Sequence, residues 1–234
     1  RAASEALARP LSPEDCMLQS MEGASPVKWN LAHTSWFFET FILQPHAPGY
    51  EPFHTDFGFL FNSYYNQIGA GLMALGCAHE QQHQELLITD LLHAMSFNPT
   101  RPAVYEDAGE PIRRSPPATA WRRMEGGVCD IGWGGGGFAF DNEGPRHKTY
   151  LHPFELANRP VTNAEYLEFM ADGGYETSEH WLADGWDAVR RQGWRAPLYW
   201  READGEWRRY SLFGEQKIDP HAPVCHVSHF EAAA

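Results

Sequence analysis

Two histidines, His79 and His83, lie four positions apart in a segment rich in leucine. On an α-helix, side chains at this spacing share one face and are about 6 Å apart at Cβ, so two imidazole rings can converge on one ion. A single histidine on an apolar face is more commonly a hydrogen-bonded core residue. For a pair inside an apolar stripe, burial without a partner would be costly, and the spacing therefore favours a metal site.

A third candidate ligand, His33, lies in an earlier segment that also has helical periodicity. It follows the same stripe as Trp29, Trp36, Thr40 and Leu43. In a helical bundle this stripe can face the histidine pair, which would give three neutral nitrogen ligands and leave positions open for water or substrate. Taken alone, His33 would more commonly be a hydrogen-bonded core residue, so its assignment as a ligand depends on the pair.

The same segment also fits H-E-x-x-H, the zinc-peptidase pattern, in which Glu80 would be the general base. The extended version of that pattern requires a glycine and a third histidine where this chain has Leu86 and Thr89. Glu106 or Glu110 could still serve as a glutamate ligand, although both lie beyond Pro99 in a linker-like stretch, which disfavours a rigidly held ligand. A peptidase therefore remains an alternative to be tested.

The order of patterns along the chain predicts two domains. Residues 1–97 have helical periodicity, with a helix start signal at Ser25-Pro26 and a second long helix from about Gly71 to Met95. Residues 98–120 contain many prolines and are expected to form a linker. Residues 121–234 contain short strand-like runs and many glycines, which are typical of a mixed domain.

Local signals predict a further helix start, a loop and the buried face of the long helix. Ser12-Pro13 has the form of a helix start, whereas residues 44–53 are expected to be a loop. On the long helix the inward face is expected to carry residues spaced three and four apart, namely Leu72, Leu75, His79, His83, Leu86 and Asp90.

Capping signals mark two helix starts in the second domain. Thr162 with Glu165, and Ser228 with Glu231, both have the spacing of a capping box. The second of these begins a helix only a few residues before Ala234, and a single helical turn is not stable alone. We therefore expect a further segment, or a second chain, to complete this domain.

The bulk composition excludes several classes of function. The chain has 234 residues and a net charge of -13, and it contains no cluster of basic residues, which argues against nucleic acid or an anionic membrane as a partner. No stretch has the form of a signal peptide or a transmembrane helix. The four cysteines form no C-x-x-C pair, so a cytoplasmic protein with free thiols is expected.

Several motifs in the same order resemble the ergothioneine and ovothiol sulfoxide synthases. In that family a DinB-like four-helix bundle precedes a mixed domain with the formylglycine-generating-enzyme (C-type-lectin-like) fold, so the resemblance implies an α+β protein. The likeness covers nearly the whole chain, and its domain from Gly126 onward is similar to the opening half of the family's second domain. The matching segments are residues 25–40, 61–66, 79–87, 158–166 and 223–228.

The resemblance implies a non-haem iron(II) enzyme that uses dioxygen. Such an enzyme joins a cysteine-type thiol, such as cysteine or gamma-glutamylcysteine, to imidazole C2 of a histidine derivative such as histidine betaine, and it oxidises the sulfur to a sulfoxide. Carried over by position, His33, His79 and His83 would hold Fe(2+), and Gln82 would face the histidine-like substrate. Gln82 alone would more commonly be a solvated helix residue.

Two tyrosines and two departures complete the comparison with that family. Tyr64 and Tyr65 would lie near the substrate pocket, although such residues alone are more commonly core or interface aromatics. Only residues 67–71 separate Asn66 from Leu72, where the family has a longer stretch that includes thiol-binding arginines and most of a bundle helix. The family's catalytic tyrosine lies in a carboxyl-terminal half that this sequence does not include, so the acid catalyst and the thiol-binding residues are unassigned.

Four alternatives to an ergothioneine sulfoxide synthase therefore remain open. An ovothiol-type enzyme would use histidine and cysteine, and a metal-dependent thiol transferase on a similar bundle would need no dioxygen. The zinc peptidase and a non-catalytic binding module are the remaining alternatives.

Overall fold

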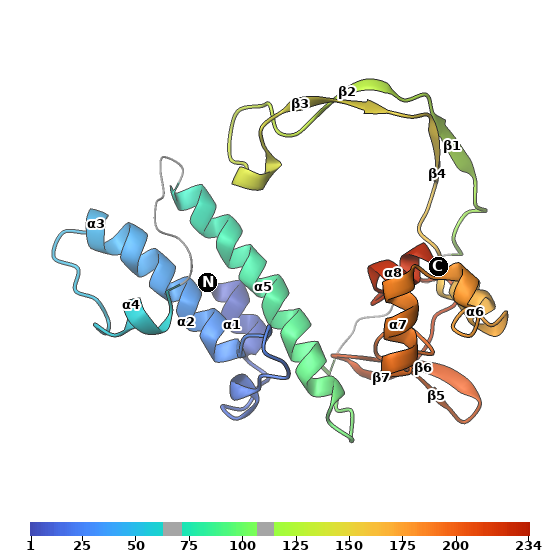
Figure 1. Ribbon diagram of the computed structural model, residues 1–234. Helices are drawn as coiled ribbons and strands as arrows, with labels where there is room; N and C mark the ends of the chain where they lie inside the picture. Colours follow the sequence, from blue (N-terminus) through green and yellow to red (C-terminus); the bar gives the residue numbers. More distant parts are fainter. Residues whose placement is uncertain (63–71, 107–114) are drawn as a thin grey trace. The chain divides into compact units, whose positions relative to one another are not determined.

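The computed structural model describes residues 1–62, 72–106 and 115–234, and the chain separates into two compact units (Figure 1). The first consists of Arg1–Val104 and Trp133–Pro145, and the second of Tyr105–Gly132 and Arg146–Ala234. The first unit is mainly helical, whereas the second contains small antiparallel sheets with helices. The expected α+β class is confirmed.

The two long helices of the first unit lie close to the positions that the sequence signals predict. The helix after Ser25-Pro26 begins at Val27, and the predicted long helix extends from Leu72 to Ser96. The elements of this unit in chain order are α1 (Ala2–Ala8), a 3₁₀ turn (Asp15–Met17), α2 (Val27–Phe38), a π-helical turn (Glu39–Leu43), α3 (Gln44–His46), α4 (Phe57–Leu60), α5 (Leu72–Ser96) and a second 3₁₀ turn (Asp141–Glu143).

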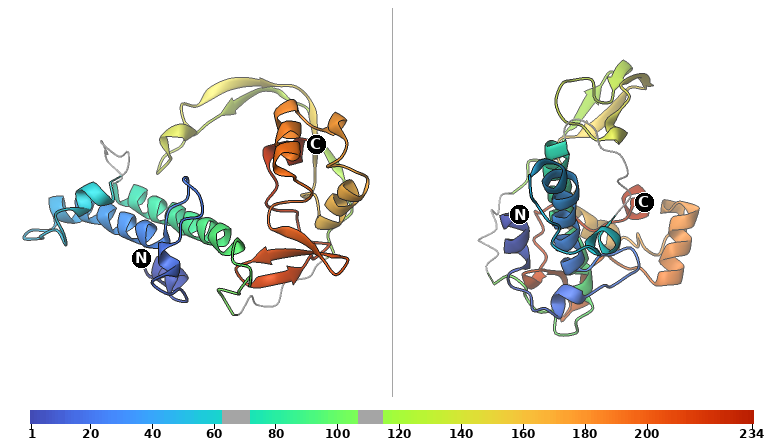
Figure 2. Two further views of the ribbon diagram at one scale, coloured as in Figure 1. Left: turned by 60° about the horizontal axis from the view of Figure 1, so that its bottom comes forward. Right: turned by 90° about the vertical axis from the view of Figure 1, so that its left-hand side faces the viewer.

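Helices α2 and α5 run side by side and form the core of this unit (Figures 1 and 2). Phe37 on α2 and Leu87 and Leu91 on α5 are at most 2% exposed. The helices approach each other closely at Gly76, where an added Cβ would lie 3.0 Å from the Phe38 ring and 3.1 Å from the Phe37 ring. A glycine is therefore required at this crossing if the backbones are to keep their spacing.

Two local predictions for this unit are wrong and one is wrong in part. Ser12-Pro13 leads only to the 3₁₀ turn, and of the loop expected at residues 44–53 the first three, Gln44–His46, are helical, whereas residues 47–53 form the loop. On α5, Leu86 is 40% exposed, whereas Gly76, Glu80, Leu87, Leu91 and Met95 are buried together with His79. The reason is that α5 packs against both α1 and α2, which widens its buried sector toward α1.

The expected four-helix bundle is represented by three packed helices. Within residues 1–62 and 72–104, α1, α2 and α5 pack on one another, and a fourth long helix is not among the elements found there. The short connection at residues 67–71, which the sequence comparison singled out, lies outside the described residues.

In its described residues, the second unit combines antiparallel strands with α-helices and a 3₁₀ turn (Ser178–His180). Its core includes Tyr166, Tyr175, Trp181 and Val189. Strand β1 (Trp121–Met124) pairs with β4 (Phe154–Ala157), β2 (Gly127–Ile131) pairs with β3 (His147–Leu151), and β5 (Trp200–Ala203), β6 (Glu206–Ser211) and β7 (Gly214–Lys217) form a three-stranded sheet. The helices are α6 (Asn163–Ala171), α7 (Ala183–Gln192) and α8 (His229–Ala233).

Both predicted capping boxes are confirmed. The Thr162 side chain accepts a hydrogen bond from the Glu165 backbone N–H at the start of α6, and Ser228 does the same with Glu231 at the start of α8. We expect Thr162→Ala to lower the free energy of unfolding by about 1 kcal/mol, because the backbone donor at the helix start loses its acceptor. Urea unfolding of the full-length protein checks this, and Thr162→Ser, which keeps the hydroxyl, should differ from wild type by much less.

Among the described residues, no helix is both long enough and apolar enough to cross a lipid bilayer. The sulfur atoms of Cys16, Cys77, Cys129 and Cys225 form no disulfide.

Candidate metal centre

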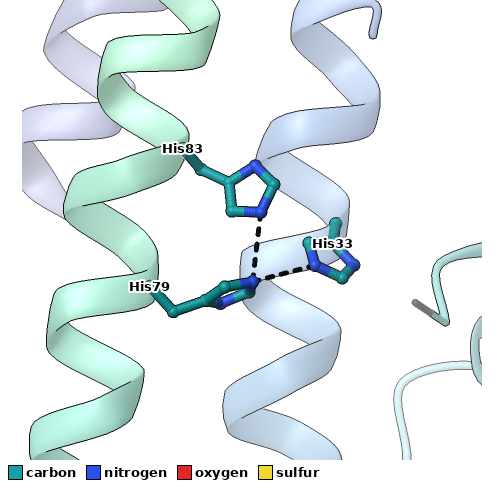
Figure 3. Close-up of side chains that lie close together, drawn as sticks. All are labelled: His33, His79 and His83. Atoms are coloured by element: carbon teal, nitrogen blue, oxygen red, sulfur yellow. Dashed lines mark hydrogen bonds between the residues drawn. The ribbon is translucent and has the colours of Figure 1, made fainter. Parts of the chain in front are cut away.

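Three histidine side chains from two helices meet between α2 and α5. Figure 3 shows His33 from α2 and His79 and His83 from α5, with their rings turned toward one another. His79 Nε2 lies 3.0 Å from His33 Nε2 and 3.1 Å from His83 Nε2. The potential ligand atoms of all three residues lie within 4.8 Å of one another, which is the geometry of a mononuclear metal site.

Aromatic side chains surround this cluster. Trp29 stacks on the His33 ring at a centroid distance of 4.6 Å and an interplanar angle of 9°, and Trp36 stacks on it at 5.4 Å. Phe37 packs on His79 at 4.7 Å. Because His33 and His79 are only 1% exposed, they are held in an environment of low polarity.

Burial keeps the three imidazoles neutral. Desolvation lowers the pKa of His79 to about 3, with further contributions from His83 and His33, and it lowers the pKa of His83 to about 4. Desolvation also lowers the pKa of His33, although a hydrogen bond to the Phe61 carbonyl opposes this shift. Neutral imidazole is the form that binds a transition metal, so at neutral pH all three rings are in the form needed for binding.

The hydrogen bond of His33 sets which of its nitrogens carries the proton. His33 Nδ1 lies 2.5 Å from the Phe61 carbonyl oxygen, which can only accept, so Nδ1 donates and Nε2 of the neutral ring carries a lone pair. One hydrogen on His79 Nε2 cannot serve both neighbouring nitrogens at once. Lone pairs are therefore left facing one another in a buried site, and a bound cation would stabilise this arrangement. The donor set thus fits a metal ion.

Glu80, the candidate base of a peptidase, faces another part of the unit. Its carboxylate accepts a hydrogen bond of 2.7 Å from the Ser4 hydroxyl on α1. It also lines a cavity of about 880 Å³, together with residues that include Thr34, Phe38 and Cys77, and none of the three histidines lines that cavity within the described part of the chain. The side chain is thus directed toward α1, whereas His79 and His83 are directed toward α2.

The other predicted site residues have different outcomes. Gln82 is exposed on α5 beside His83, and its contact with substrate stays a prediction. Tyr64 and Tyr65 lie outside the described residues, as does Glu110, whereas Glu106 is exposed. The sequence interpretation did not identify Asn30, which is 2% exposed and contacts His83. Its position three residues before His33 placed it near the candidate ligands, and a buried amide requires a partner.

Residues 110–234 match the family with a sulfatase-modifying factor enzyme 1-like domain. The chain belongs to this family.

Its similarity to individual proteins extends into the helical unit and confirms the resemblance to the ergothioneine sulfoxide synthases. It is 34% identical over 165 residues to hercynine oxygenase of Mycolicibacterium smegmatis, which is 69% of this chain and 36% of that protein. It is 40% identical over 97 residues to hercynine oxygenase of Mycobacterium tuberculosis, which is 41% of this chain and 22% of that protein. It is 52% identical over 33 residues to ergothioneine biosynthesis protein 1 of Schizosaccharomyces pombe, which is 14% of this chain and 4% of that protein. The chain thus spans about a third of the length of the first of these relatives.

Proposed function

We propose that this chain carries the metal-binding part of a non-haem iron(II), dioxygen-dependent sulfoxide synthase of ergothioneine biosynthesis. The observation that carries the proposal is the buried meeting of three neutral imidazoles, whose Nε2 atoms are 3.0 Å and 3.1 Å apart across α2 and α5. The similarity to two proteins named hercynine oxygenase supports histidine betaine, the trimethylated histidine, as the substrate.

The proposed reaction joins the sulfur of a cysteine-type thiol to imidazole C2 of the histidine betaine. One thiol, one imidazole C–H and one dioxygen molecule give one sulfoxide and one water. The new C–S bond and the S–O bond each account for two electrons, which together reduce dioxygen fully. Bound iron(II) would supply the redox chemistry and would bring the reactants together.

The residues of this chain would hold the ion, shield it on one side and orient the substrate. His33, His79 and His83 would hold the ion without adding negative charge, since all three are neutral. Trp29 stacks on His33 and lies 6.1 Å from the His83 ring, so it would form an apolar wall beside the ion. Gln82, exposed one residue before His83, would orient the imidazole of the substrate through its amide group.

The test uses the full-length protein loaded with iron(II) under anaerobic conditions. We expect oxygen consumption only when both a thiol and histidine betaine are present, and mass spectrometry should detect a sulfoxide that joins the two. Turnover of plain histidine with cysteine in place of the betaine would instead indicate an ovothiol-type enzyme. Thiol transfer in the absence of oxygen would reject the proposal in favour of a transferase.

Replacing Glu80 separates the proposed synthase from the zinc peptidase. We expect Glu80→Gln to keep the metal and to change sulfoxide formation by less than about threefold, since the side chain contacts Ser4 and not the histidines. A peptidase base is a general base, whose loss typically lowers the rate about 10²–10⁴-fold. Peptide hydrolysis and sulfoxide formation are measured on the same preparations, and loss of hydrolysis in Glu80→Gln would favour the peptidase.

A further inference from the structure

A buried asparagine joins the beginning of α2 to one of the histidines on α5. Asn30 Oδ1 lies 2.7 Å from His83 Nδ1, and the Asn30 side chain is 2% exposed. A polar side chain buried to this degree needs a hydrogen-bond partner, and His83 is the partner of the Asn30 oxygen.

The orientation of the Asn30 amide is determined by its other contacts. Asn30 Nδ2 donates to the backbone carbonyls of Ser25 at 3.2 Å and Pro26 at 3.4 Å. Carbonyl oxygens only accept, so the NH₂ group must face them, and the amide oxygen must therefore face His83. Since an amide oxygen also only accepts, His83 Nδ1 is the donor and carries the hydrogen.

The consequence for His83 is a fixed tautomer. With the hydrogen on Nδ1, Nε2 of the neutral ring has a lone pair, and it lies 3.1 Å from His79 Nε2. If the hydrogen were on His83 Nε2, that atom would donate to His79 and both nitrogens would be unable to bind a metal. The Asn30 oxygen stabilises the tautomer that leaves them available.

A second contact with α5 fixes the backbone of Ser25, to which the Asn30 side chain donates. The backbone N–H of Ser25 donates to Asp90 Oδ2 at 2.9 Å, and Asp90 follows His83 by two helical turns on α5. A chain of hydrogen bonds thus leads from Asp90 through Ser25 and Asn30 to His83. Both ends of this chain of hydrogen bonds lie on α5. The beginning of α2 and the Asn30 amide are therefore fixed in position relative to His83.

We propose that Asn30 is a positioning residue of the metal centre, which selects the Nδ1–H tautomer of His83 and so directs its Nε2 lone pair to the ion. The inference rests on the three-histidine site of the proposed function. It concerns a residue that would not contact the ion, the thiol or the histidine betaine.

The first test needs no metal and no variant. In full-length metal-free protein labelled with ¹⁵N-histidine at neutral pH, the His83 resonances, assigned with His83→Gln, should have the chemical shifts of a protonated Nδ1 and an unprotonated Nε2. A His83 ring that is protonated at Nε2 in the wild-type protein would overturn the proposal.

The second test is Co²⁺ binding, followed through the visible absorption of the ion. Asn30→Leu removes the acceptor at similar volume, and we expect about 10–100-fold weaker binding, as for other outer-shell partners of metal ligands. Asn30→Asp keeps an acceptor for His83 Nδ1 although it loses the donor to the Ser25 and Pro26 carbonyls, and it should bind more tightly than Asn30→Leu. Ser35→Ala, on the exposed side of α2, is the matched control and should bind as wild type does.

The outcomes separate the two proposals. Wild-type protein that binds no Co²⁺ and no Fe²⁺ would reject the metal site and the proposed function with it. Wild-type binding that is unchanged in Asn30→Leu, or that is lost equally in Asn30→Leu and Asn30→Asp, would reject the positioning role alone. If Asn30→Leu does not fold, the wild-type ¹⁵N shifts still decide.

Discussion

His79→Ala is expected to abolish stable iron binding, with a loss of affinity greater than about 100-fold. His79 Nε2 is the atom that lies beside both other ligand nitrogens, at 3.0 Å and 3.1 Å. Its removal leaves two ligands on different helices. Loss of a mere outer-shell partner already costs about 10–100-fold, and a direct ligand should cost more.

Elemental analysis of anaerobically purified full-length protein measures this effect. Wild type should contain iron near one per chain, and His33→Ala and His83→Ala should lose it as His79→Ala does. His54→Ala, which removes an exposed histidine, should keep it. Iron near one per chain in His79→Ala would disprove the site. Zinc alone in wild type, after a check for metal exchange, would favour the transferase or the peptidase.

The second large effect is a loss of stability of the metal-free protein in acid. The pKa of His79 is about 3 and that of His83 about 4 in the folded protein, against an ordinary value of 6.5. Below pH 6.5 the unfolded chain binds protons at these histidines and the folded chain does not. Stability therefore falls as the pH drops from about 6.5 to about 4, by on the order of 5 kcal/mol for the two groups.

Urea unfolding of the metal-free full-length protein between pH 7 and pH 4 checks the prediction. His83→Gln removes one of the two groups and should reduce the dependence on pH by about half, whereas His54→Gln should leave it as in wild type. Equal pH dependence in wild type and His83→Gln would show that His83 is protonated in the folded state as readily as in the unfolded one.

The features that the sequence predicts well are local ones. The spacing of His79 and His83 and the capping box at Thr162 depend on residues within one helical turn, so the pattern contains the whole interaction. The contact between His83 and Asn30 joins residues 53 positions apart, and that between His33 and Phe61 joins residues 28 positions apart. Such contacts depend on how the helices pack, which periodicity does not determine.

The error on α5 has the same origin. Leucine spacing alone placed Leu86 inside, but a leucine can lie on either border of an apolar stripe. The buried sector is decided by which neighbours the helix has. Here both α1 and α2 pack on α5, and the polar Glu80 is buried because Ser4 on α1 donates to it.

The glycine at the crossing of α2 and α5 links the packing of the two helices to the proposed metal site. Gly76 lies one turn before His79, and the Phe37 ring that an added Cβ would meet also packs on the His79 ring. A methyl group there would press on the Phe37 and Phe38 rings, which would have to give by a few tenths of an ångström. Metal–ligand distances in well-formed sites stay within about 0.2 Å of their usual values. A substitution at Gly76 is therefore expected to shift the Phe37 ring against His79 and so to weaken binding of the proposed ion.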